Sequence, residues 1–357
     1  MRVAVLGVGL IGGSIGLAAR ECVEDVEVVG FGRSAERLEQ ARELGAIDRV
    51  AGSLDEALDG ASVCFCCAPV GALDAQVAAA LAAAGDDCVV TDVGSTKGGV
   101  VEAAADGRFV GGHPIAGAET AGVEHARADL FQGATWYLTP TRDSSGVLFE
   151  RLHRLVAALG ARPVAIDAES HDRLLATVSH LPHVLANALV TQTAGALGEE
   201  DAALPRVGPS FRDATRVAGA NSAIWTDIYV ANREAIAAEV DALVERLQDA
   251  AELLRAGDAA AITSWNEQAA DARRRLLEAD LAGGVVHELR TTVPNRPGIV
   301  AEVALALGRA GVNIVDMALA PAPDMRSGAI TLWIAGDAEA DRARQLIDDL
   351  GFPVAEA

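Results

Sequence analysis

The sequence is nearly free of lysine, since Lys97 is the only one in 357 residues and the other strongly basic residues are all arginine. With 29 basic side chains against 51 acidic ones, the net charge is −22 at pH 7. This excess of negative charge argues against a nucleic acid or an anionic membrane as partner. An acidic composition poor in lysine suggests a solvent of high salt, where screening weakens the repulsion between like charges.

Cysteines and long apolar runs are also scarce. Three of the five cysteines, Cys64, Cys66 and Cys67, lie in the apolar run 63–70, which is typical of a buried strand. Because neighbouring strand residues point to opposite faces, these thiols cannot converge on one metal, and we expect structural thiols in a reducing compartment. The chain starts with a strand pattern, and we find no apolar run of the roughly 20 residues that span a membrane. We therefore predict a cytoplasmic protein without a signal peptide.

Short β-rich segments alternate with helical patterns in the first half of the chain. Alternation of this kind, with apolar strands, predicts a parallel sheet covered by helices on both faces. The expected strands are 2–6, 26–31, 63–68, 88–93, 108–111, 135–138 and 163–166, with helices such as 35–44, 72–84 and 147–159 between them.

The second half changes character twice. Long helical patterns follow residue 167, at 184–196, 221–255 and 259–277. After residue 282 a short unit of the order βαββα(β) is expected, with strands 285–293, 313–320 and 329–335 and helices 298–310 and 337–349. The chain is thus predicted to be an α/β protein of three domains: a Rossmann-type parallel-sheet domain (1–167), an all-helical domain (168–281) and a small βαββαβ domain (282–357).

The first strand runs directly into the sequence Gly7-Val-Gly9-Leu10-Ile11-Gly12. A strand, Gly-x-Gly-x-x-Gly and then a helix is the context that a dinucleotide-binding site requires. The first glycine permits a tight turn, the second lets the backbone approach the pyrophosphate, and the third lets the helix pack closely on the strand. We therefore predict that Gly7, Gly9, Leu10, Ile11 and Gly12 contact a nicotinamide dinucleotide.

The end of the second strand bears on which dinucleotide is bound. Sites selective for NAD place a carboxylate there for the ribose 2′-hydroxyl, whereas this chain has Gly32 followed by Arg33 and Ser34. A guanidinium pairs with a 2′-phosphate, which a carboxylate would repel. The pattern favours NADP over NAD, with a solvated loop arginine as the alternative explanation of Arg33.

Five segments together resemble the prephenate/arogenate dehydrogenase family, in order and in spacing over residues 1–281. They are Gly7-Val-Gly-Leu-Ile-Gly-Gly-Ser14, Asp92-Val-Gly-Ser-Thr-Lys97, Gly112-His-Pro-Ile-Ala-Gly117, Ser179-His-Leu-Pro-His183 and Asp213-Ala-Thr-Arg216. The resemblance implies a Rossmann domain followed by a helical dimerisation domain, with the active site in the cleft between them. It also implies oxidative decarboxylation of prephenate with NAD(P), or of arogenate as the alternative substrate, and a homodimer.

A hydride-removing reaction at a carbinol needs an acceptor for the hydroxyl proton, and a neutral imidazole suits that role near pH 7. His113 at a strand end is the best candidate, and it corresponds to the family's catalytic histidine. The family also implies that Ser95 bonds near the same carbinol, although a serine after glycine is a common helix cap. Lys97 could act near the cofactor or the substrate, or be a solvated loop residue.

A dicarboxylate substrate needs cationic partners. Arg216 matches the family's carboxylate-binding arginine, because a guanidinium grips a carboxylate with two parallel bonds, and Arg212 lies beside it in the motif. His183 is expected to contact substrate, and Asp172 matches a family position near the active site. His180 and His183 could instead form a zinc pair, but no third ligand stands at conventional spacing, so we predict no metal.

The segment from Val286 resembles an ACT domain, a small ligand-sensing unit. Its signature is Val293-Pro-Asn-Arg-Pro-Gly298-Ile299 followed by Gly311-Val-Asn-Ile314. The resemblance implies an amino-acid effector, which we expect to be tyrosine near Gly298, or else a role in holding subunits together.

Two other functions compete with the dehydrogenase. A β-hydroxyacid dehydrogenase needs a catalytic lysine in its second domain, whereas Lys97 lies in the first. A non-catalytic NAD(P) sensor would have no need of His113, His183 and Arg216 together.

Overall fold

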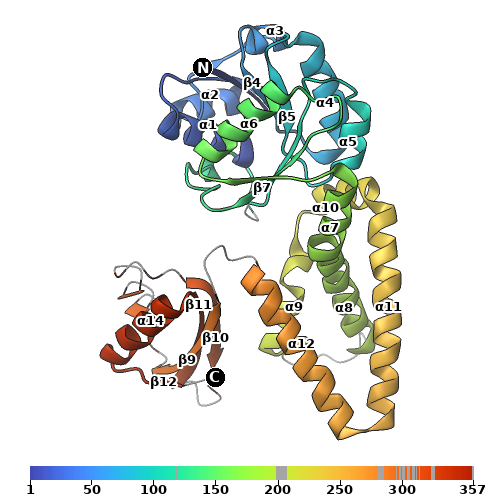
Figure 1. The fold of residues 1–357 in the computed structure, drawn as a ribbon, viewed down its shortest axis with the longest axis vertical. Coiled ribbons are helices and arrows are strands. Elements are labelled where there is room, and N and C mark those ends of the chain that lie inside the picture. The colour runs from blue at the N-terminus through green and yellow to red at the C-terminus, as the bar shows by residue number, and fades with distance from the viewer. Residues whose placement is uncertain are drawn as a thin grey trace. The chain divides into compact units, whose positions relative to one another are not determined.

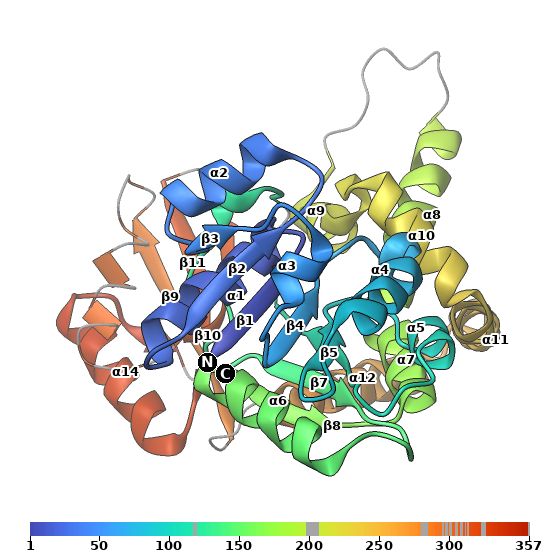
Figure 2. The same cartoon turned by 90° about the horizontal axis from the view of Figure 1, so that it is seen from above.

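The computed structural model describes residues 1–116, 120–197, 207–279, 285–294, 314–322 and 326–355, together with 296, 299, 302–303, 306–307, 310 and 312. The chain divides into two compact units, Met1–Val244 and Glu245–Ala357. Figure 1 and Figure 2 show the elements of both units from two directions.

A five-stranded parallel sheet forms the centre of the first part of the chain, in the order β3-β2-β1-β4-β5. Both of its faces are covered, because alternate residues of one strand enter different apolar cores. Val3 and Val5 pack with Ile15 of one helix, whereas Ala4 and Leu6 pack with Leu73 of another. The sheet predicted from the apolar strands is thus confirmed. Its strands are β1 (Arg2–Leu6), β2 (Glu27–Phe31), β3 (Arg49–Val50), β4 (Val63–Cys66) and β5 (Val89–Asp92), and its helices are α1 (Leu10–Cys22), α2 (Ala35–Glu43), α3 (Leu54–Leu58), α4 (Val70–Ala83), α5 (Gly98–Ala103) and α6 (Gly146–Ala158).

The later strands form a second, three-stranded sheet instead of extending the first one. β6 (Gly111–Pro114) pairs antiparallel with β7 (Thr135–Thr139), which pairs parallel with β8 (Arg162–Ala165). Before β6, Phe109 makes one isolated parallel bridge to Val90. A parallel pair needs a crossover helix, and the described part of the β6–β7 connection contains only the short turn η1 (Val123–His125). The strand expected at 108–111 therefore begins only at Gly111, and the chain after it returns to form the antiparallel strand β7.

A nearly continuous helical segment leads away from β8. It consists of α7 (Ala168–Leu175), the π-helical turn η2 (Ala176–His180) and α8 (Leu181–Leu197). By length and composition alone, Ala168–Ala196 could cross a membrane, although buried helices of soluble proteins pass the same test. Its buried face carries His171, Asp172, His180 and His183, which is typical of a site-bearing helix inside a protein.

The long helix expected at 221–255 is divided in two. α10 (Ser222–Ala231) ends at Asn232, and α11 (Arg233–Ala256) follows it. The buried side chain of Asn232 donates to the backbone carbonyl of Asp172 (2.8 Å) and lies 3.2 Å from Nδ1 of His180. These tertiary contacts hold Asn232 out of helical geometry, at φ −114° and ψ 25°. The remaining elements of this part are α9 (Pro209–Thr215) and the 3₁₀ turn η3 (Arg216–Gly219).

The second unit contains α12 (Ala259–Ala279) and a four-stranded antiparallel sheet in the order β10-β11-β9-β12. Its core includes Leu289, Leu332 and Ile347. Most of the helix expected at 298–310 and three residues of the 293–299 signature (295, 297 and 298) lie outside the described residues. The elements of the sheet are β9 (Val286–Pro294), β10 (Ile314–Pro321), β11 (Ser327–Ala335), α14 (Asp337–Asp349) and β12 (Val354–Ala355).

Candidate active site

The turn between β1 and α1 has the geometry of a dinucleotide cradle. Gly7 adopts a φ of +104°, which side chains with a Cβ rarely adopt, and its N–H donates to the carbonyl of Phe31 (2.8 Å). A Cβ on Gly12 would lie 2.3 Å from the carbonyl oxygen of Gly7, so only glycine lets the helix pack this closely. A Cβ on Gly9 would meet nothing within 4 Å, which leaves room for a phosphate against the backbone.

The residues that follow complete this cradle. α1 begins at Leu10, so its first N–H groups face the turn and can meet an anion. Leu10 and Ile11 are half-buried and pack against the core below the turn. The residues present therefore fit the pyrophosphate of a nicotinamide dinucleotide.

The end of β2 presents positive charge. Arg33 is exposed, and its side chain has no hydrogen bond or ion pair with any described residue; the same holds for the side chain of Arg37. Ser34 caps α2, with its hydroxyl accepting the N–H of Arg37 (3.3 Å). In a chain with so large an excess of acid, two neighbouring arginines without an ion pair are available to an anionic ligand.

Three side chains, which we call the catalytic network, form a continuous line of hydrogen bonds. Nδ1 of His113, at the end of β6, lies 2.9 Å from Nε2 of His171, and Nδ1 of His171 lies 2.8 Å from Oδ1 of Asp172. His171 and Asp172 both belong to α7, and both are buried. Figure 1 shows β7, the neighbour of β6, and α7 in the same part of the molecule.

Asp172 is held as an anion by its surroundings. Its Oδ1 also accepts the N–H of Lys97 (2.7 Å), and its Oδ2 accepts the N–H of Gly98 (2.7 Å). Burial alone would raise the pKa of Asp172, but the hydrogen bonds from His171, Gly98 and Lys97 outweigh it and lower that pKa. Since the carboxylate can only accept, His171 must donate to it.

This order fixes the proton on each ring of the catalytic network. If Nδ1 of His171 donates to Asp172, then Nε2 of His171 accepts, and Nδ1 of His113 is the donor. The lone pair of His113 is then on Nε2. Burial lowers the pKa of His113 well below 6.5, and the neighbouring His171, Lys97 and His180 act in the same direction. His113 is thus a neutral imidazole with an acceptor nitrogen turned away from His171.

Ser95 lies in the loop after β5, half-buried and without a hydrogen bond to any described residue. Asp92 connects this loop to the strand of His113. Its Oδ2 accepts the N–H of Gly94 (2.8 Å), and its Oδ1 accepts the N–H of Gly112 (3.0 Å). Ser95 follows Gly94 and His113 follows Gly112, so one carboxylate holds both segments.

Lys97 is neither a solvated loop residue nor exposed to a ligand, because its side chain is fully buried. It forms an ion pair with Asp92, which is equally buried. Burial lowers the pKa of Lys97, whereas Asp92 and Asp172 act against that shift.

A second group of side chains, which we call the aromatic cluster, lies where α8 meets α10. The rings of His183 and Trp225 are stacked, with centroids 3.6 Å apart and an interplanar angle of 5°. Nδ1 of His183 hydrogen-bonds the hydroxyl of Tyr229, and the amide nitrogen of Asn187 lies 3.3 Å from the same Nδ1. Burial lowers the pKa of His183, and the carbonyl of Val217 works in the opposite direction.

Asn232 joins the two groups through His180, which is 1% exposed. Burial lowers the pKa of His180 to about 4, so its ring is neutral. Within the described chain, the buried Nε2 atoms of both His180 and His183 have no hydrogen-bond partner. Buried polar atoms are normally satisfied by a protein group or an ordered water, so each of these nitrogens has the capacity for one more hydrogen bond.

In sequence, the two arginines predicted to bind substrate lie between His183 and Trp225 of the aromatic cluster. Arg216 begins η3, and the carbonyl of the next residue, Val217, acts on His183. Arg212 is on α9 and, like Arg216, exposed. The described residues include no group of three or more His, Cys, Asp or Glu side chains that could hold a metal.

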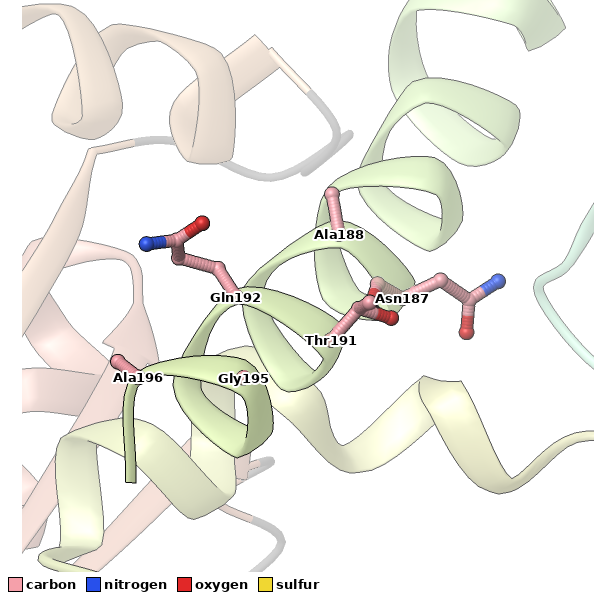
Figure 3. Close-up of a pocket in the computed structure, with 6 residues that line it drawn as sticks. All are labelled: Asn187, Ala188, Thr191, Gln192, Gly195 and Ala196. Atoms are coloured by element: carbon pink, nitrogen blue, oxygen red, sulfur yellow. The ribbon is translucent and has the colours of Figure 1, made fainter. Parts of the chain in front are cut away.

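A hollow of about 610 Å³ lies along α8, and only uncharged residues line it. Its lining consists of Asn187, Ala188, Thr191, Gln192, Gly195 and Ala196. In Figure 3 the amides of Asn187 and Gln192 point to different sides of the helix. Asn187 is the residue that connects this face to His183.

Sequence reasoning missed three contributors to the site. His171, which could be taken for a helix-start residue, lies in the middle of the catalytic network. Asn232 and Tyr229 supply hydrogen bonds to His180 and His183. The pairing of His171 with Asp172 in sequence was the one available signal, since adjacent imidazole and carboxylate groups often act together.

Comparison with known proteins finds matches over most of the chain. Residues 15–165 match the model of the prephenate dehydrogenase nucleotide-binding domain, and residues 167–268 match that of the prephenate dehydrogenase dimerization domain. A prephenate dehydrogenase of Bacillus subtilis is 30% identical over 354 residues, 97% of this chain and 95% of the relative. A cyclohexadienyl dehydrogenase of Zymomonas mobilis is 32% identical over 252 residues, 69% of this chain and 86% of the relative.

Solved structures agree with these matches. The prephenate dehydrogenase of A. aeolicus, solved with hydroxyphenyl propionate and NAD⁺, has a TM-score of 0.71 and 28% identity, covering 76% of this chain and 97% of that one. Synechocystis arogenate dehydrogenase has a TM-score of 0.69 and 27% identity, covering 77% of this chain and 100% of that one.

Proposed function

The chain belongs to the prephenate dehydrogenase family, an oxidoreductase family that uses a nicotinamide cofactor, and we propose on that premise that it converts prephenate to 4-hydroxyphenylpyruvate with NADP. The observation that carries this assignment is the catalytic network, which leaves His113 neutral with a free acceptor at Nε2. Such a group is what the removal of a hydride from a carbinol carbon requires.

The cofactor, held at the Gly7–Gly12 turn, supplies the acceptor for the hydride. As the C–H bond breaks, Nε2 of His113 accepts the proton of the carbinol hydroxyl, and the O–H bond becomes an N–H bond. Loss of the ring carboxylate as CO₂ then leaves its electron pair in the ring, which becomes aromatic with negative charge on the oxygen. Protonated His113 returns its proton to that oxygen, so no proton is gained or lost overall. Asp172 stabilises the protonated state through His171 while it lasts.

The other predicted residues keep substrate roles in this proposal, with one exception. In the proposal Ser95 hydrogen-bonds the carbinol oxygen, Arg216 pairs with a substrate carboxylate, and Arg212 adds positive charge. His183 contacts the substrate side chain in this proposal, with its ring held at Nδ1 by the hydroxyl of Tyr229. Asp172 becomes a positioning residue, since its carboxylate already accepts from His171, Lys97 and Gly98.

NADP is favoured by the end of β2. Gly32 supplies no carboxylate to repel a 2′-phosphate, and Arg33 and Arg37 have no ion pair with a described residue. The match to a dimerization domain and the exposed apolar side chains of α8 and α10, such as Leu185, Leu189 and Ile224, support a homodimer. The three domain boundaries, the cytoplasmic location and a tyrosine effector at the small domain remain predictions from the sequence.

The test is an assay of the purified protein in high salt, with prephenate or arogenate and with NAD⁺ or NADP⁺, recording the absorbance of the reduced nicotinamide. We expect the highest kcat/KM with prephenate and NADP⁺. A clear preference for arogenate would change the substrate while keeping the chemistry. Absence of reduced nicotinamide with all four combinations, in a protein that is folded by circular dichroism, would refute the dehydrogenase.

A further inference from the structure

The fully buried ion pair of Lys97 and Asp92 has no part in the mechanism described above. Both side chains are inaccessible to solvent, so neither can touch substrate or cofactor directly. Apolar residues of similar volume would serve the stability of a fold as well as a buried ion pair, or better. The pair therefore calls for an explanation other than stability.

The contacts of Asp92 supply such an explanation. Its two carboxylate oxygens accept from two different segments, Oδ2 from the N–H of Gly94 (2.8 Å) and Oδ1 from the N–H of Gly112 (3.0 Å). These segments are the loop of Ser95 and the strand of His113. Their backbones are also in close contact, because a Cβ on Gly112 would lie 2.6 Å from the carbonyl oxygen of Asp92.

Lys97 allows Asp92 to accept hydrogen bonds from both segments. A neutral carboxyl group carries a proton on one oxygen and could not accept from both N–H groups in the same way. The ion pair places Nζ of Lys97 against Oδ2, so Asp92 acts as a carboxylate and both of its oxygens accept. The backbone N–H of Lys97 donates in turn to Asp172, which connects this pair to the catalytic network.

We infer that Asp92 and Lys97 are a pair of positioning residues that hold the hydroxyl of Ser95 and the imidazole of His113 in one fixed arrangement around the reacting carbinol. This inference rests on the proposed function, in which both groups meet the same substrate oxygen. Small errors in such an arrangement have large effects on rate, because the reacting atoms must be aligned before the barrier is crossed.

Lys97 also contributes a positive charge near His113. The titratable groups around His113 are His171 and Asp172 from α7, His180 from η2, Tyr137 from β7, Asp92 from β5 and Lys97 itself. Burial, His171 and then Lys97 lower the pKa of His113. Removal of the Lys97 charge should therefore raise that pKa, which gives the experiment a readout besides kcat.

The experiment compares three variants of the full chain: Lys97→Met, which keeps the aliphatic stem, Asp92→Asn, and the double variant. Asparagine has one acceptor oxygen, so it can satisfy only one of the two N–H groups. The double variant has no buried charge and should recover most of the thermal stability that the single variants lose. We nevertheless expect its kcat to be at least tenfold below that of the wild type, with an unchanged KM.

The matched control is Arg20→Met with Asp48→Asn. Asp48 also pairs with an arginine (3.1 Å) and accepts a backbone N–H, from Val28 (2.8 Å), but on the far strand β2. That double variant should keep the wild-type kcat. In Lys97→Met, the acid limb of the kcat/KM profile should also move to higher pH.

The inference is overturned if the folded double variant has a kcat within twofold of the wild type. It is overturned equally if folded Lys97→Met keeps both the kcat and the pH profile, so either variant is sufficient if the other does not fold. A wild-type protein without dehydrogenase activity would be a failure of the proposed function and would be visible before any variant is made.

Discussion

The catalytic network and the aromatic cluster differ in how completely their hydrogen bonds are made. In the first, each bond from His113 to His171 to Asp172 is in place, and the backbone of Lys97 and Gly98 fixes its far end. In the second, His183 is stacked and anchored at Nδ1, but Nε2 of both His183 and His180 lacks a partner within the described chain.

Under the proposed function, this difference corresponds to a division of work between proton transfer and substrate recognition. The group that handles the proton is prepared before substrate arrives, because any adjustment during the reaction would add to the barrier. The groups that recognise substrate are left unsatisfied, because a ligand gains most from polar groups that it alone can satisfy. The predictions below test each side of this division.

The largest effect is expected at His113. His113→Asn removes the proton acceptor but keeps a polar side chain, so kcat should fall roughly 10²–10⁴-fold with little change in KM. Steady-state kinetics with saturating NADP⁺ measures both. A variant that keeps more than about a tenth of the wild-type kcat would end the assignment of His113 as the proton acceptor.

Asp172→Asn should have the next largest effect. The amide would donate to Nδ1 of His171 and so reverse the proton order, which leaves Nε2 of His113 protonated and unable to accept. A drop in kcat of roughly 10²–10³-fold is expected, by analogy with the tautomer change in Ser-His-Asp enzymes. The matched control is Asp167→Asn on the same helix, where the carboxylate caps α7 at the N–H of Ser170 (2.8 Å). If both variants lose the same activity, the network has no special role.

Variants of the residues proposed to bind substrate should change KM instead of kcat. Arg216→Gln removes a carboxylate partner, so KM for prephenate should rise roughly 10- to 100-fold while kcat changes little. Arg212→Gln, one turn away, should raise KM less. A loss that falls mainly on kcat would mean that Arg216 acts in the transition state and that the division drawn above is wrong.

A smaller effect is expected at the cofactor. Arg33→Asp places a carboxylate beside the 2′-phosphate site, so KM for NADP⁺ should rise about tenfold and KM for NAD⁺ should change less. Initial rates with each cofactor give the ratio. A wild type that prefers NAD⁺ by a wide margin would contradict the cofactor argument whatever the variant does.

Local sequence patterns were sufficient for some of these features. The strand before Gly7 and the spacing of three glycines predicted the cradle, since that turn depends on neighbouring residues alone. The prediction of His113 rested on its place at a strand end next to glycine together with the family resemblance. The strands β1, β2, β4 and β5 followed from apolar segments that alternate with helices, whereas the two-residue strand β3 was not predicted.

Other features depend on contacts between distant segments, which a single sequence does not reveal. The break at Asn232 exists because its side chain bonds residues on α7 and η2, which lie 60 and 52 positions away. The role of His171 and the burial of Lys97 likewise require β5, β6 and α7 to meet. The second sheet forms because the β6–β7 connection turns back, which the strand pattern could not indicate.

The most direct test of the account is the pH dependence of kcat/KM for the wild-type protein with its preferred substrate. His113 must be neutral to accept a proton, so activity is lost as pH falls through its pKa. Since burial, with His171 and Lys97 acting in the same direction, lowers that pKa well below 6.5, kcat/KM should stay level from pH 8 to below pH 6.5 and fall only at more acidic values. An acid limb with its midpoint at or above pH 6.5, absent in His113→Asn, would contradict the central claim that the network keeps His113 poised as a neutral base.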